Sequence, residues 1–176
     1  MAMVLGMSLP TFTLLHVIIS LIGIVTGIVV VLAMIGGRKL AGWTDVFLWT
    51  TVLTSVTGFL FPFTKFGPPH AVGVLSLIIL VPTLLGLYAF HLAGSWRWIY
   101  IAGSVASLYF NSFVAVVQAF NKIPALNVLA PTQTNEPAFA ISQGLVLVLF
   151  VVLGFLATKR FHPAVPAPSR SSPAMT

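Results

Sequence analysis

The chain has 176 residues, of which 59% are hydrophobic and only 6% are charged. About a quarter of the residues in a typical soluble domain are charged, so this composition predicts an integral membrane protein. The net charge of +6 comes from Lys and Arg residues that stand singly or in pairs between apolar runs, and they form no basic face that would bind nucleic acid. Without cysteine, disulfides, thiolate catalysis and cysteine-ligated metals are excluded.

Five apolar segments of about 20 to 25 residues each predict an all-α fold: a polytopic membrane helical bundle with about five transmembrane helices. The N-terminal segment carries no Lys or Arg and stays apolar far beyond a signal-peptide core, so we expect it to be a permanent span. The bundle would occupy residues 1–161. The Pro/Ser/Ala-rich residues 162–176 would form a disordered cytoplasmic tail. The expected spans are residues 11–35, 43–63, 70–92, 98–120 and 138–157.

The first span carries a polar and small-residue face. His16, Ser20, Gly23 and Gly27 are spaced by four, three and four residues, so they share one side of a helix. The pair Gly23 and Gly27 forms a G-x-x-x-G motif, which lets another helix approach closely. A histidine inside a span is costly and often functional. His16 is therefore either a ligand-binding residue or a neutral histidine that hydrogen-bonds a threonine of the next span.

The second span, residues 43–63, carries a stripe of hydroxyl groups in an otherwise apolar helix. Thr50, Thr54 and Thr57 fall on one face, and such a stripe packs better against other helices than against lipid. We expect it to form an inner wall of the bundle. Asp45, at the start of this span, is expected to cap the helix N-terminus.

The third span follows the Gly67-Pro68-Pro69 turn and contains Pro82, which predicts a kink. His70 lies at its start. His16 and His70 are only weak candidates for a metal or haem site, because their expected depths in the membrane differ. Glu136, before Pro137, is expected to cap the fifth span, and the loop 121–137 to hold a short interfacial helix that either covers a pocket or simply joins two spans.

Polar groups of the fourth and fifth spans are expected to meet this inner wall in the outer half of the bundle. They would form either interhelical hydrogen bonds or a pocket for a quinone, lipid or haem. The candidate ligand-binding residues are His16, Thr54, Thr57, Asn111, Gln118 and Gln143. The candidate helix-packing residues are Gly23, Gly27, Gly103 and Ser107.

The positive-inside rule predicts the orientation. Lys65 and Lys122 fall on one side of the membrane, and the other side, which would be cytoplasmic, receives six basic residues. The N-terminus is therefore expected outside and the C-terminus inside. The six residues are Arg38, Lys39, Arg97, Lys159, Arg160 and Arg170.

Several strings resemble those of a family of small bacterial inner-membrane proteins with several helices. They are LHVIISLIGIVTG, TTVLTSVTGFLFPF, FNSFVAVVQAF followed by NKIPAL, and APTQTNEPAF. The resemblance runs from about Thr11 to Phe155. It implies a multi-pass protein of the bacterial inner membrane, and it implies no activity, cofactor or catalytic residue.

Two functions follow from these observations. The first is a non-catalytic accessory or structural subunit of a membrane complex, or a homo-oligomer, with the lipid bilayer and other membrane subunits or itself as partners. The alternative is a redox-associated membrane protein that binds a quinone, lipid or haem in the outer half of the bundle. No catalytic motif is recognisable, so an enzyme is the less favoured class.

Overall fold

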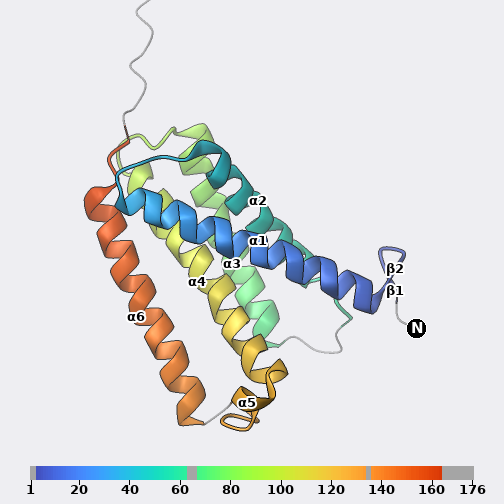
Figure 1. The fold of residues 1–176 in the computed structure, drawn as a ribbon. Coiled ribbons are helices and arrows are strands. Elements are labelled where there is room, and N and C mark those ends of the chain that lie inside the picture. Colours follow the sequence, from blue (N-terminus) through green and yellow to red (C-terminus); the bar gives the residue numbers. More distant parts are fainter. Residues whose placement is uncertain (1–2, 63–66, 134–135, 164–176) are drawn as a thin grey trace, which may run out of the picture.

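The computed structural model describes residues 3–62, 67–133 and 136–163, and it is an all-α helical bundle (Figure 1). A small antiparallel hairpin of β1 (Met3–Val4) and β2 (Met7–Ser8) precedes the helices. The helices are α1 (Leu9–Ile35), α2 (Ala41–Gly58), α3 (Pro68–Leu84), the π-helical η1 (Leu85–Ala89), α4 (Trp96–Lys122), α5 (Pro124–Asn127) and α6 (Pro137–Arg160).

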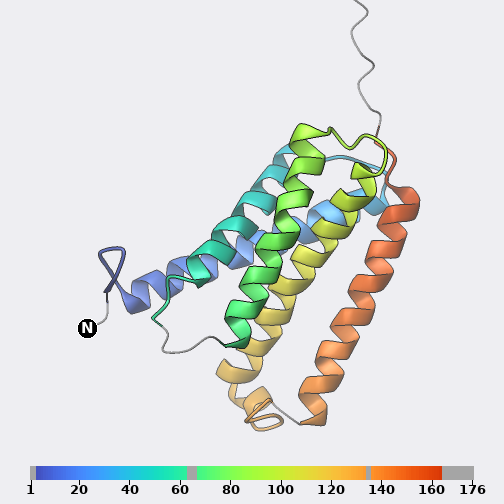
Figure 2. The same ribbon diagram turned by 180° about the vertical axis from the view of Figure 1, so that it is seen from behind.

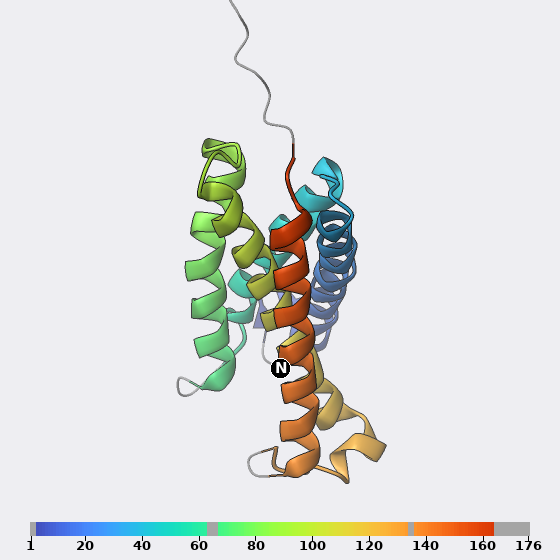
Figure 3. The same ribbon diagram turned by 90° about the vertical axis from the view of Figure 1, so that its left-hand side faces the viewer.

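Helix α4 is at the centre of the bundle and contacts α1, α2, α3 and α6. Helices α1 and α2 run antiparallel beside each other and cross the group formed by α3, α4 and α6 (Figures 1 and 2). Viewed from the side, α4 lies between α3 and α6 (Figure 3). The fully buried Phe47, Leu48, Ile101 and Leu108 lie between these helices, and the rest of the core comes from α1, α3, η1, α4 and α6.

The expectation of five spans is wrong by one. Among the described residues, four helices are long and apolar enough to cross a membrane: α1, α3 extended by η1, α4 and α6. The chain is therefore a multi-pass membrane protein. Helix α2 has 18 residues and ends at Gly58, before the expected end at Phe63. Its Asp45 and hydroxyl groups lower the mean hydropathy of this short helix, although it packs beside α1.

The third span changes its helical form after Pro82. Pro82 lies inside α3 and cannot donate a backbone hydrogen bond, and the π-helical turn η1 begins three residues later. Its wider turn is closed by the Phe90 amide, which donates to the Leu85 carbonyl at 2.9 Å. His91 and Leu92 adopt positive φ angles, so the helix ends at Ala89 instead of the expected Leu92.

The basic residues of three helices gather at one end of the bundle. Arg97, in the first turn of α4, donates a hydrogen bond to the Phe161 carbonyl just after α6, at 2.9 Å. The end of α1 lies next to the end of α6, because a Cβ built on Gly37, just after α1, would lie 3.5 Å from the Arg160 carbonyl oxygen. This end therefore brings together the charges expected on the cytoplasmic side. Phe63, Lys65, Asn135 and the predicted tail from residue 164 onward, with Arg170, lie outside the described residues.

Candidate functional site

His16 and Thr57 meet between α1 and α2, with His16 Nδ1 2.8 Å from Thr57 Oγ1. Thr57 donates its hydroxyl hydrogen to the Leu53 carbonyl at 2.6 Å, so its oxygen accepts from His16. The histidine therefore carries its hydrogen on Nδ1. Phe61 meets the imidazole edge-on, with ring centroids 5.1 Å apart. This geometry makes His16 a bridge between two helices, one of the two roles expected from the sequence.

Asn111 joins a second contact, deeper in the bundle, at which α1, α2 and α4 meet. Its amide nitrogen donates to Thr51 Oγ1 at 3.3 Å, and Thr51 in turn donates to the Phe47 carbonyl. Gly23 of α1 lies directly opposite, because a Cβ at this position would lie 3.2 Å from Thr50 Oγ1 and 3.5 Å from Asn111 Nδ2. The hydroxyl stripe and the glycine face are thus in direct contact.

The remaining polar candidates lie apart from these two contacts. Gln143 of α6 donates to the Phe113 carbonyl of α4 at 3.1 Å, whereas Gln118 is exposed on α4. The hydroxyl of Thr54 is buried and has no hydrogen-bond partner in the described part of the chain. The structure thus brings His16 to Thr57, gives Asn111 and Gln143 other partners, and does not gather the six candidates around one cavity.

The candidate packing residues lie at close helix contacts. A Cβ on Gly27 would lie 2.7 Å from both Leu108 Cδ1 and Phe47 Cε2. A Cβ on Gly103 would overlap the Thr83 hydroxyl and lie 3.0 Å from Thr83 Cβ. Ser107 is fully buried on α4, and its hydroxyl has no partner within the described ranges.

His70 takes part in the start of its own helix. Its Nδ1 accepts a hydrogen bond from the Gly67 amide at 3.3 Å, and its ring lies 6.1 Å from that of Phe59. His16 is bonded to α2 instead. No group of three His, Asp or Glu side chains that could hold a metal ion occurs among residues 3–62, 67–133 and 136–163.

Asp45 departs from its expected role, whereas Glu136 occupies its expected position at the start of α6. Asp45 is not a helix cap, since α2 already begins at Ala41 and its first turn contains no acidic residue. It accepts a hydrogen bond from the Tyr88 hydroxyl of η1 at 2.5 Å instead. Glu136 occupies the N-cap position of α6, but its carboxylate binds the hydroxyl of Thr132. No local sequence signal links Asp45 to a tyrosine 43 residues away.

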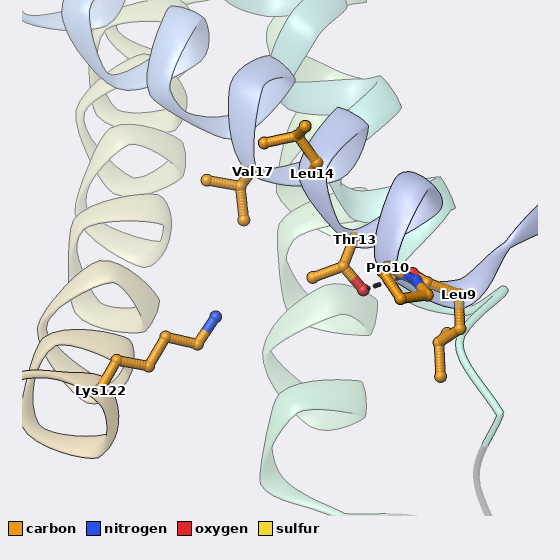
Figure 4. A pocket seen from close by; sticks show the side chains of 6 residues that line it. All are labelled: Leu9, Pro10, Thr13, Leu14, Val17 and Lys122. Carbon is orange, nitrogen blue, oxygen red and sulfur yellow. Dashed lines mark hydrogen bonds between the residues drawn. The ribbon is translucent and has the colours of Figure 1, made fainter.

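An apolar groove of about 500 Å³ lies at the end of the bundle opposite the basic residues. One face of α1 forms its wall, and the side chain of Lys122 extends toward that face from the end of α4 (Figure 4). The lining side chains are Leu9, Pro10, Thr13, Leu14, Val17 and Lys122. A second groove, of about 300 Å³, lies between α2 and the end of the third span.

Comparisons of the chain with protein-family models, with curated proteins and with solved structures gave no match.

Proposed function

We propose that this protein is a non-catalytic subunit of the bacterial inner membrane, which works as an accessory or structural part of a larger complex or as a homo-oligomer. The observation that carries the proposal is the outer face of α6. Of the 24 residues of this helix only Phe150 and Ala157 are buried. Ala140 and Gly144 lie four residues apart and are both exposed, and a Cβ on Gly144 would meet nothing within 4 Å.

Gly144, which is exposed, differs from the glycines that lie in the interior of the bundle. Gly23, Gly27 and Gly103 are each covered by a neighbouring helix of the same chain. Glycine destabilises a helix by about 1 kcal/mol relative to alanine, and this cost is offset when another helix packs closely on it. Gly144 has no such neighbour in the described chain, and a helix from a second subunit would supply one.

The polar contacts support the same function. His16 with Thr57, Asn111 with Thr51, and Gln143 with the Phe113 carbonyl each join two helices. These side chains therefore hold the bundle together, and the partner-facing surface would be apolar. The positive-inside rule and the resemblance to small bacterial inner-membrane proteins support the location.

Native mass spectrometry of the protein purified from its own membrane in mild detergent tests the proposal. We expect an assembly larger than one 18.8 kDa chain. Gly144→Leu should shift it towards the single chain, because the larger side chain blocks close helix approach. Gly42→Leu is the matched control, since Gly42 also has open space around it but lies at the start of α2. A single unaccompanied 18.8 kDa chain in the wild type would refute the proposal.

The groove at Lys122 favours a second candidate function, the binding of a small amphiphile in the outer half of the bundle. Its apolar wall suits an acyl or prenyl chain, and the ammonium group of Lys122 suits an anionic head such as a lipid phosphate. Quinone and haem remain the other candidate ligands. A visible spectrum and mass spectrometry of co-purifying molecules test this function. We expect an anionic lipid that is lost in Lys122→Gln, and a preparation without bound lipid, quinone or haem would exclude it.

A further inference from the structure

We propose that the basic end of the bundle binds the headgroup of an anionic phospholipid between Arg38, Arg97 and Arg160. These arginines come from the loop after α1, the first turn of α4 and the last turn of α6. The site lies at the opposite end of the bundle from the groove at Lys122. It depends neither on that groove nor on the proposed assembly.

Two contacts place the three arginines around the end of α6. Arg97 Nη1 donates to the Phe161 carbonyl at 2.9 Å. A Cβ on Gly37 would lie 3.5 Å from the Arg160 carbonyl oxygen, and Arg38 follows Gly37 directly in the chain (Figure 1). The Arg97 guanidinium and the loop after α1 therefore contact two successive carbonyl groups of the chain.

The Arg97 guanidinium is held in place and still has hydrogen-bond donors to offer. Its carbon lies 4.7 Å from the ring centroid of Trp98, and one of its N–H groups donates to the Phe161 carbonyl. A guanidinium has five N–H donors in a planar fork that matches a phosphate. The other four have no hydrogen-bond partner in the described part of the chain, so they can bind an anion.

The two basic side chains at the end of α6 lie on different faces of the helix. Arg160 follows the fully buried Ala157 by three residues, so it begins on the face that packs against the bundle. The Lys159 ammonium lies over the ring of Phe155 at 5.5 Å, and Phe155 is 60% exposed. Arg160 thus belongs to the site, whereas Lys159 adds only general positive charge.

The chain cannot neutralise the charge of this end. Five described Lys and Arg residues lie here, and the whole chain has only two acidic residues. Asp45 binds the Tyr88 hydroxyl, and Glu136 precedes the other end of the 24-residue α6, about 36 Å away. Helix ends add at most about half a charge each, and α1 and α6 end here whereas α2 and α4 begin here. A surplus of about three positive charges therefore remains.

A phospholipid fits this end better than a free anion because apolar surface adjoins the arginines. On α6, Val151, Val152 and Phe155 are 63%, 48% and 60% exposed, and this helix is long and apolar enough to cross a membrane. Trp98, beside Arg97, is 48% exposed. Basic pockets between membrane helices bind anionic headgroups. A lipid would place its phosphate between the arginines and its acyl chains along α6.

Native mass spectrometry of the full chain, freed of lipid in detergent, tests the site. The probes are dioleoyl phosphatidylglycerol and dioleoyl phosphatidylcholine, which have the same chains but an anionic and a zwitterionic head. All proteins carry Lys122→Gln, so that the groove at the other end does not contribute. We expect phosphatidylglycerol to bind about tenfold more tightly, and Arg97→Lys to weaken its binding about tenfold. Lysine keeps the charge but not the planar fork.

Arg160→Gln and Lys159→Gln form a matched pair, because each removes one positive charge from the last turn of α6. We expect Arg160→Gln to weaken the binding of phosphatidylglycerol about tenfold and Lys159→Gln about twofold. Arg160→Gln leaves the bond from Arg97 to Phe161 in place, so its effect does not depend on the stability of Arg97→Lys. Equal affinity for the two lipids, equal losses in the matched pair, or displacement of the lipid by an equal concentration of inorganic phosphate would overturn the proposal.

Discussion

At Gly27, helix α1 closely approaches both α2 and α4. A methyl group there would lie 2.7 Å from side-chain atoms of both Phe47 and Leu108, so both would have to move. We expect Gly27→Ala to lower the stability of the bundle by about 1–3 kcal/mol, seen as a lower thermal unfolding temperature in detergent. Gly42→Ala is the control, because the site is open and alanine favours a helix. An unfolding temperature of Gly27→Ala at or above that of Gly42→Ala would contradict this packing.

The bond between His16 and Thr57 can be measured by a double-mutant cycle. Hydrogen bonds between membrane helices contribute on average about 0.6 kcal/mol, and we expect a coupling energy of that order between His16→Phe and Thr57→Val. The measurement is unfolding in increasing proportions of a denaturing detergent. His70→Phe paired with Thr57→Val is the reference and should show no coupling, because His70 bonds to the Gly67 amide. Equal coupling in both cycles would argue against a direct His16–Thr57 bond.

At the scale of helices, α3 and α4 approach each other through Gly103 and Thr83. Gly103→Ala would place a methyl group on the Thr83 hydroxyl, and we expect a loss of about 1–3 kcal/mol. Thr83→Ala removes the hydroxyl and a methyl group, so the double variant should recover part of the loss. Thermal unfolding of the two single variants and the double variant provides the measurement. A double variant no more stable than Gly103→Ala would show that the two helices are separated by something other than this contact.

The long helices could be predicted from the sequence because hydropathy and length determine them locally. Four of the five expected spans correspond to candidate membrane helices, with ends that differ by up to three residues. The fifth expected span, residues 43–63, does not correspond to a candidate membrane helix. Asp45 and the hydroxyl groups lower the hydropathy of the helix 41–58, although this helix packs against α1. The four-and-three spacing correctly placed Gly23 and Gly27 on one face of α1.

Contacts between distant helices were less predictable. The face containing Asn111 was visible in the sequence, but its partner Thr51 is 60 residues away, and the spacing on one helix does not fix the rotation of another. For the same reason Gln118 was expected in a cluster but is exposed. The π-helical turn that brings Tyr88 to Asp45 depends on how the backbone adjusts after Pro82, for which residues 85–89 give no distinctive signal.

At the scale of the whole molecule, the collection of basic residues at one end predicts the orientation in the membrane. The positive-inside rule predicts that this end is cytoplasmic. The chain contains no cysteine, so single cysteines can report on it without background. Thr132→Cys, in the loop before α6, should react with a membrane-impermeant thiol reagent added to intact cells. Ser95→Cys, just before α4, should react only after the membrane is opened, and the opposite pattern would reverse the orientation.

The hydrogen bond from Arg97 to the Phe161 carbonyl also bears on the order in which the bundle is assembled during synthesis. Arg97 is made 64 residues before its partner, and the ribosome must complete α6 before this contact can form. The three spans that precede α6, which are α1, α3 with η1, and α4, would therefore be inserted with the Arg97 guanidinium still hydrated or on lipid phosphates. The contact between the start of α4 and the residue after α6 is therefore the last to form at the basic end of the bundle. A chain interrupted before residue 161 would lack this contact.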